Sequence, residues 1–122
     1  NDAITSAYAM HFLLEAKLQG YAIPAGVYTA GINYLKELAT KEVTTLEDAR
    51  LTAYSIYLLT RNEIVTTNYL TNLQLVLNNS KSIAWKEDIT SAYLAVTYQL
   101  LKSNTEADKL INYYHPGAKQ AS

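Results

Sequence analysis

A short motif, Ala-Tyr followed by an apolar run, occurs three times in the chain and constrains its fold more than any other feature. The tyrosines of the three copies are Tyr8, Tyr54 and Tyr93, which lie 46 and 39 residues apart. Periods of this length are typical of stacked helix pairs, in which no single unit can bury its own apolar face. The motif therefore predicts an all-α fold of paired helices, and its unequal spacing indicates a degenerate repeat.

Apolar periodicity and residues typical of helix ends predict about six helices in one all-helical domain, residues 1–122. Gly20 supplies the left-handed residue that ends the first helix. Thr44 and Glu47 have the spacing of a capping box before the third helix. Gly31 lies inside the second helix and predicts the close approach of a neighbouring helix. The predicted helices span about residues 2–19, 24–39, 46–61, 66–79, 86–103 and 106–114, and residues 118–122 form a frayed tail.

The helices alternate in character along the chain. The first, third and fifth are apolar almost all round, whereas the second, fourth and sixth each carry a single apolar stripe. This alternation predicts a curved α/α stack with an inner row of enclosed helices and an outer row half in water. Because the first helix is apolar on more than one side, we expect an exposed apolar flank on it and a tendency to self-associate.

Composition excludes several function classes. The net charge of −1, with no basic run, argues against nucleic-acid binding. The chain has no cysteine, which excludes disulfides, thiolate metal sites and cysteine nucleophiles but does not decide the cellular compartment. No apolar run approaches the length of a membrane span, and no direct membrane contact is expected. The N-terminus does not resemble a signal peptide, and its abrupt helical start indicates a segment cut from a longer chain.

No residue of the chain is predicted to be catalytic, cofactor-binding or metal-binding. His11 is interpreted as a buried imidazole hydrogen-bonded within the repeat, and His115 as a helix-end residue. Glycine-rich phosphate loops, Ser/His/Asp sets and metal motifs are absent from the sequence. The remaining candidates are two charge groups interpreted as solvated, namely Glu15 with Lys17 and Glu47 with Asp48 and Arg50.

The aromatic residues are expected to be structural. Tyr8, Tyr54 and Tyr93 occupy equivalent repeat positions, where a packed ring and a hydroxyl that reaches polar atoms suit an inter-helix site. Trp85 lies in the predicted connection before the fifth helix. It is expected to cover the edge of the core, and the alternative is that it anchors a partner.

Three stretches together resemble the later helical part of the thioester (complement-like) domain of bacterial α2-macroglobulins. They are AYAMHFLLEAKLQGYAIP at residues 7–24, INYLKEL at residues 32–38 and ARLTAY at residues 49–54. Their order and spacing agree with that domain through about Tyr98. The resemblance implies an arc of an α/α toroid, within a large periplasmic or secreted and often lipid-anchored protein that traps proteases.

In that family a strained Cys–Gln thioester, carried by a Cys-x-Glu-Gln motif, acylates a lysine of the attacking protease. This chain has no counterpart of that motif, and residues 39–45 contain no counterpart of the histidine that modulates the thioester in related complement proteins. The resemblance therefore implies a scaffold role and transfers no catalytic residue. The implied partners are proteases, as targets of the parent protein, and other domains of the same chain.

Two other functions are weighed against this inert fragment of a protease inhibitor. One is a free-standing helical-repeat module that binds a peptide or protein on its concave face. The other is an enzyme of the α/α toroid class, such as a cyclase or a glycosidase. Such an enzyme needs acidic residues that converge inside the ring, and the predicted inner helices carry almost none.

Overall fold

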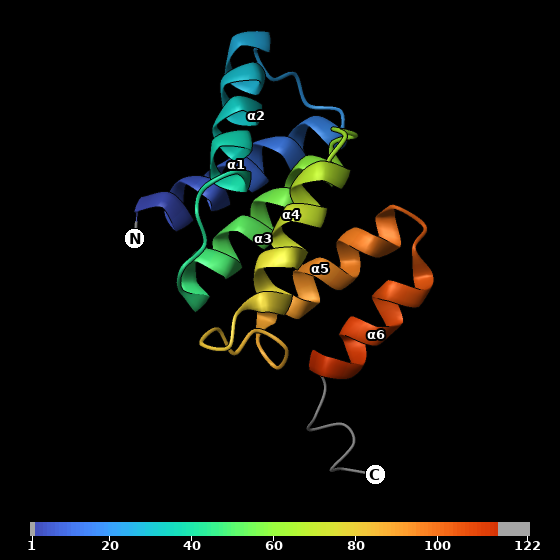
Figure 1. Cartoon of the computed structure of the whole chain (residues 1–122). Coiled ribbons are helices and arrows are strands. Elements are labelled where there is room, and N and C mark those ends of the chain that lie inside the picture. The colour runs from blue at the N-terminus through green and yellow to red at the C-terminus, as the bar shows by residue number, and fades with distance from the viewer. Residues whose placement is uncertain (1, 115–122) are drawn as a thin grey trace.

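The computed structural model of the chain describes residues 2–114, and all regular secondary structure over that range is helical (Figure 1). No strand occurs among these residues, which confirms the predicted all-α class with six helices. The predicted frayed tail and His115 lie outside the described residues. The helices are α1 (Asp2–Leu18), α2 (Ala25–Ala39), α3 (Leu46–Arg61), α4 (Thr67–Asn79), α5 (Ile89–Leu100) and α6 (Asn104–Tyr114).

Helix α3 is the centre of the arrangement. It packs against α1, α2, α4 and α5, while α6 packs against α5 (Figure 1). Among consecutive helices, α1 contacts α2, α2 contacts α3, α3 contacts α4, and α5 contacts α6. The odd-numbered helices form a row, with α3 between α1 and α5, as the repeat of the Ala-Tyr motif predicts. No helix of the described range is both long and apolar enough to cross a membrane.

The predicted enclosure of all three odd-numbered helices is wrong for α1. Helix α3 buries nine residues because it has neighbours on several sides, whereas α1 buries only Ala7 and Leu14. Phe12 of α1 is 75% exposed, and Tyr8 and Leu18 are also exposed. Since α1 contacts only α2 and α3 substantially, its apolar surface exceeds the surface that its neighbours cover. The exposed apolar flank predicted for the first helix is therefore present.

Some helices begin or end at other residues than predicted, because local hydrogen bonds fix their ends. At α3 the capping box is formed by Thr45 and Asp48, one residue later than predicted, with Asp48 N–H donating to Thr45 Oγ1 at 3.1 Å. Gly20 has φ of 97° and follows α1, as predicted.

Helix α5 is shorter than predicted. Its N-cap is Asp88, whose side chain accepts from Thr90 N–H at 3.0 Å. Residues 85–88 are instead closed by a turn in which Asp88 N–H donates to Trp85 O. The helix ends before Lys102, which adopts a left-handed φ of 63°. Helix α6 then begins at Asn104, two residues earlier than predicted.

Gly31 lies buried where α1 and α2 meet, as its position inside a helix predicts. A Cβ atom built on Gly31 overlaps the sulfur of Met10 from α1. The absence of a side chain therefore lets the two helices approach at this point, which offsets the helix-destabilising effect of glycine.

We expect Gly31→Val to lower the free energy of unfolding by about 1–3 kcal/mol, because the added methyl groups force Met10 or α1 to move. Urea denaturation followed by circular dichroism measures this change. The same substitution in a Met10→Ala background should be clearly less damaging. Equal losses in both backgrounds would show that contact with Met10 is not the reason for the glycine.

Candidate functional site

The three repeat tyrosines lie side by side across the row of odd-numbered helices. Tyr54 of α3 is in the middle, with its ring centroid 5.5 Å from that of Tyr8 on α1 and 5.0 Å from that of Tyr93 on α5. The first pair is edge-to-face at 64° and the second is tilted at 41°, arrangements that aromatic rings prefer over a flat sandwich. Positions that are equivalent in the sequence repeat are thus in contact in space.

Burial raises the pKa of Tyr54 well above its usual range, and the neighbouring Tyr93 and Tyr8 add to this shift. The Tyr54 hydroxyl therefore keeps its proton at neutral pH. The hydroxyl oxygen is hydrogen-bonded to His11 Nδ1 at 2.5 Å, and the imidazole tautomer decides which of the two atoms donates. His11 is half-buried and bonded between repeats. Its imidazole is hydrogen-bonded as predicted, but it is less buried than expected.

A second link joins α1 to α3 beside this histidine. Arg61 donates from both Nε and Nη2 to the carboxylate of Glu15, with 3.0 Å between Nη2 and Oε2. This hydrogen bonding by Arg61 lowers the pKa of Glu15 against an opposing effect of burial. Lys17 Nζ lies 4.9 Å from the centroid of the Tyr28 ring on α2. Glu15 therefore joins α1 to α3 through an ion pair that the prediction of a solvated charge did not include, whereas Lys17 is exposed to solvent, as predicted, beside the Tyr28 ring.

Arg50 and Asp88 form the corresponding link between α3 and the start of α5. Arg50 donates from Nε and from Nη2 to Asp88, with 2.6 Å between Nη2 and Oδ1. Burial opposes ionisation of Asp88, but hydrogen bonds from Arg50 and Thr90 outweigh it and lower its pKa. Asp48 caps α3. The second group predicted to be solvated, Glu47 with Asp48 and Arg50, therefore contains one helix cap and one inter-helix ion pair.

These carboxylates predict a loss of stability in acid. The pKa values of Glu15, Asp48 and Asp88 are all lowered in the folded state, so their contribution is present above the unfolded-state values near 4.5 and 3.8. It is lost as pH falls through the lower folded-state values. We expect Asp88→Asn to remove roughly 1 kcal/mol of this pH-dependent stability, a modest figure because Arg50 is exposed to solvent.

Urea titrations at pH 7 and pH 3 measure that difference. Asp108→Asn is the matched control, since Asp108 is exposed on α6. A pH dependence that is identical in Asp88→Asn and in the unmodified chain would contradict the assigned role of the Arg50 link.

The row of tyrosines lines a shallow apolar hollow of about 460 Å³. Its walls come from α1, α3 and α5 alone, and ring and aliphatic carbons make up nearly all of its surface. We call it the tyrosine face. Its lining residues are Tyr8, His11, Tyr54, Tyr57, Ile89, Ala92, Tyr93 and Val96.

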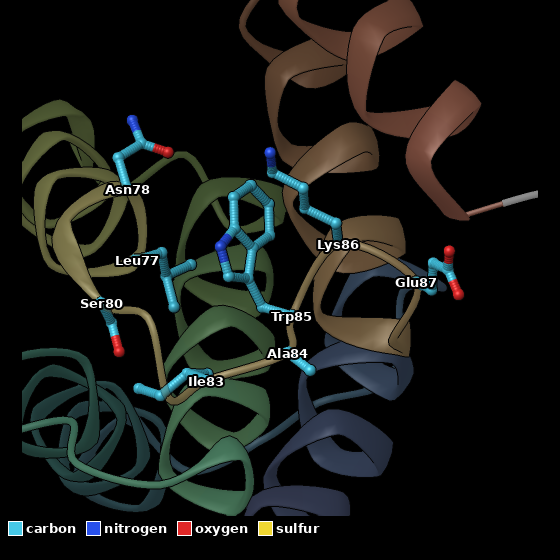
Figure 2. Close-up of a pocket in the computed structure, with 8 residues that line it drawn as sticks. All are labelled: Leu77, Asn78, Ser80, Ile83, Ala84, Trp85, Lys86 and Glu87. Atoms are coloured by element: carbon cyan, nitrogen blue, oxygen red, sulfur yellow. The ribbon is translucent and has the colours of Figure 1, made fainter.

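A second cavity, of about 470 Å³, lies beside the connection between α4 and α5 (Figure 2). Trp85 is buried and packs edge-to-face on Tyr113 of α6, with centroids 5.9 Å apart. Figure 2 shows the indole between Leu77 and Lys86, while Glu87 points away from the cavity. Trp85 therefore covers the edge of the core, as expected. It lies where α4, α5 and α6 come together.

The polar groups described above link helices to one another. Arg50, Asp88, Arg61, Glu15 and His11 all bond across helix boundaries. Over residues 2–114 no group of three or more His, Cys, Asp or Glu side chains could hold a metal ion. The two ion pairs were missed from the sequence because each joins residues at least 38 positions apart. The Asp-x-Thr spacing of Asp88 and Thr90 was a usable sign of the α5 cap.

Comparison with known proteins gives the family. No protein-family profile matches the chain, and no solved structure matches it. It is 39% identical over 114 residues to an alpha-2-macroglobulin of Rickettsia conorii, and 38% identical over 110 residues to an alpha-2-macroglobulin homolog of Yersinia pestis. It is also 37% identical over 118 residues to an alpha-2-macroglobulin of Pasteurella multocida.

These alignments cover 93%, 90% and 90% of the chain, whereas the chain spans only 6% of the length of each relative. Similarity along almost the whole chain, to three proteins of the same name, shows that the chain belongs to the alpha-2-macroglobulin family, whose much longer members it matches over one short segment.

Proposed function

We propose that the chain is a non-catalytic scaffold segment of an alpha-2-macroglobulin-type protease inhibitor. The observation that carries this proposal is the similarity along nine tenths of the chain to bacterial proteins of that name. The internal links described above support it, since Arg50, Arg61 and His11 bond to partners on other helices and hold the row together. In this proposal the segment supports the folded structure of the parent protein and takes no part in a chemical reaction.

The proposal extends to the parent protein. Its targets are proteases, its location is the periplasm, the cell envelope or the outside of the cell, and any lipid anchor belongs to another part of it. Because this chain contains no cysteine, a Cys–Gln thioester would come from elsewhere in the polypeptide. In this reading the six helices form an arc of the α/α toroid of the thioester domain.

A protease-trapping assay tests this function. The product of the complete gene and the 122-residue chain are each incubated with a protease, and cleavage of a large protein substrate is compared with cleavage of a small peptide. A trap obstructs the large substrate by steric exclusion and leaves the peptide accessible. We expect this signature from the complete product and no effect from the chain alone.

Variants of the complete product connect that signature to the segment. Tyr54→Ala, which removes the middle of the tyrosine row, should reduce trapping, while Tyr21→Ala at an exposed loop position should not. Inhibition by the isolated chain, or a complete product that leaves cleavage of the large substrate unchanged, would contradict the proposal.

The tyrosine face favours one alternative, a free-standing module that binds another protein. Its shallow, apolar hollow is the kind of surface that protein partners use. A complete gene of about the length of this chain, with a product that binds a peptide ligand at this face, would favour that alternative over the scaffold role.

A further inference from the structure

The tyrosine face is an apolar surface left uncovered by the helices of this chain. All its lining residues belong to α1, α3 and α5, and α2, α4 and α6 contribute none. Tyr8, Ile89 and Val96 are exposed on it although they are large apolar side chains. Phe12, one helical turn after Tyr8 on α1, is also exposed. An apolar surface that spans three helices is unfavourable in water and marks a contact site.

We infer that the tyrosine face is the docking surface for an apolar helix from another part of the parent polypeptide. This inference rests on the proposed function, because it requires the chain to be a segment of a longer inhibitor. It specifies where that longer protein holds the segment and by which kind of contact.

The charges around the hollow exclude a strongly charged occupant. Arg50 lies near one end of the tyrosine row, where its guanidinium is already bound to Asp88. Glu15 and Arg61 are bound to each other beside His11. An acidic or basic partner would therefore meet groups whose charge is already compensated, so the favourable contribution comes from burial of apolar area, at about 25 cal/mol per Å².

The backbone of the face determines that the occupant is helical. Because α1, α3 and α5 satisfy their backbone hydrogen bonds internally, the face has no free strand edge with which an extended segment could pair. A segment buried there must satisfy its own N–H and C=O groups, and a helix does so. The ridges of a helix also fit the grooves between neighbouring helices, as α3 already fits between α1 and α5.

The length of the relatives favours an occupant from the same polypeptide. Each relative extends far beyond the matched segment, which is 6% of its length. A helix tethered to the segment is present at a high effective concentration, in the millimolar range for short linkers, so a shallow apolar contact suffices to hold it. A second copy of the chain has no such advantage, and it becomes an alternative outcome of the test.

Thiol labelling tests the inference on the protein as it exists. The chain has no cysteine, so Val96→Cys introduces a single thiol on the tyrosine face. Val76→Cys on α4 is the matched control, since both valines are on helices and have similar exposed fractions, 37% and 42%. The rate of maleimide labelling at each position is measured by mass spectrometry of the corresponding peptide, in the isolated chain and in the complete gene product.

We expect position 96 to be labelled at least about tenfold more slowly in the complete product than in the isolated chain, with position 76 nearly unchanged. Equal rates at position 96 in the two proteins would overturn the inference, as would equal protection at both positions. Protection of position 96 that appears only as the isolated chain is concentrated would assign the face to a second copy. Since trapping is assayed separately, a complete product that inhibits but leaves position 96 accessible contradicts only this inference.

Discussion

Replacing Tyr54 by alanine is expected to lower the free energy of unfolding by about 3–5 kcal/mol, the largest effect of a single substitution in the tyrosine row. The ring is buried in α3 and contacts Tyr8, Tyr93 and His11 together. Its removal leaves a cavity between three helices, and it also takes away the hydrogen bond to His11 Nδ1. Urea denaturation at pH 7, followed by the helix signal in circular dichroism, measures the loss.

Two further variants separate the contributions of the ring and the hydroxyl. Tyr54→Phe keeps the ring and should lose only about 1 kcal/mol, because it removes one hydrogen bond from a half-buried histidine. Tyr21→Ala, at a residue that is 70% exposed, should change stability by less than about 0.5 kcal/mol. If Tyr54→Ala were no worse than Tyr21→Ala, the tyrosine row would not be a structural element of the fold.

Replacing Trp85 by alanine is expected to have an effect of similar size, about 3–5 kcal/mol. Trp85 is 4% exposed although it lies outside the helices, and it packs on Tyr113 of α6 and beside Leu77 of α4 (Figure 2). Its removal should therefore loosen α6 before the rest of the chain. Hydrogen exchange of the α6 amides, together with the urea midpoint, measures this local loss.

The conservative variant Trp85→Phe should lose less than half of the unfolding free energy that Trp85→Ala loses, since a smaller ring can still pack edge-to-face on Tyr113. This comparison also tests the alternative in which Trp85 anchors a partner. In that case Trp85→Ala would leave the isolated chain as stable as before and would weaken only the complete gene product.

Much of the fold could be predicted from the sequence because its signals are local or periodic. The number and order of the helices follow from apolar periodicity and from breaks such as Gly20 and Pro24. The contact among Tyr8, Tyr54 and Tyr93 follows from their equivalent positions in the repeat. Gly31 also signals a close helix contact by its place inside a helix, although the sequence does not name Met10 as the neighbour.

The candidate site was less predictable because its polar links join distant residues. Nothing local to Glu15 identifies Arg61 as its partner, and the same is true of Arg50 and Asp88. A surface charge and an inter-helix ion pair look alike in a helical pattern, since both lie on the polar side of the apolar stripe. The lining of the tyrosine face likewise depends on how α1, α3 and α5 are placed relative to one another.

The sequence by itself determined the all-helical class, the number and order of the helices and the row of repeat tyrosines, because backbone hydrogen bonding and apolar periodicity act over a few residues. Only the tertiary structure decided which of the apolar helices are enclosed. Helix α3 is buried on several sides, while α1, with a more apolar sequence, keeps Phe12 in water. The reason is physical: burial is a property of the neighbours that a helix has, and a helix's own residues do not specify how many neighbours reach it.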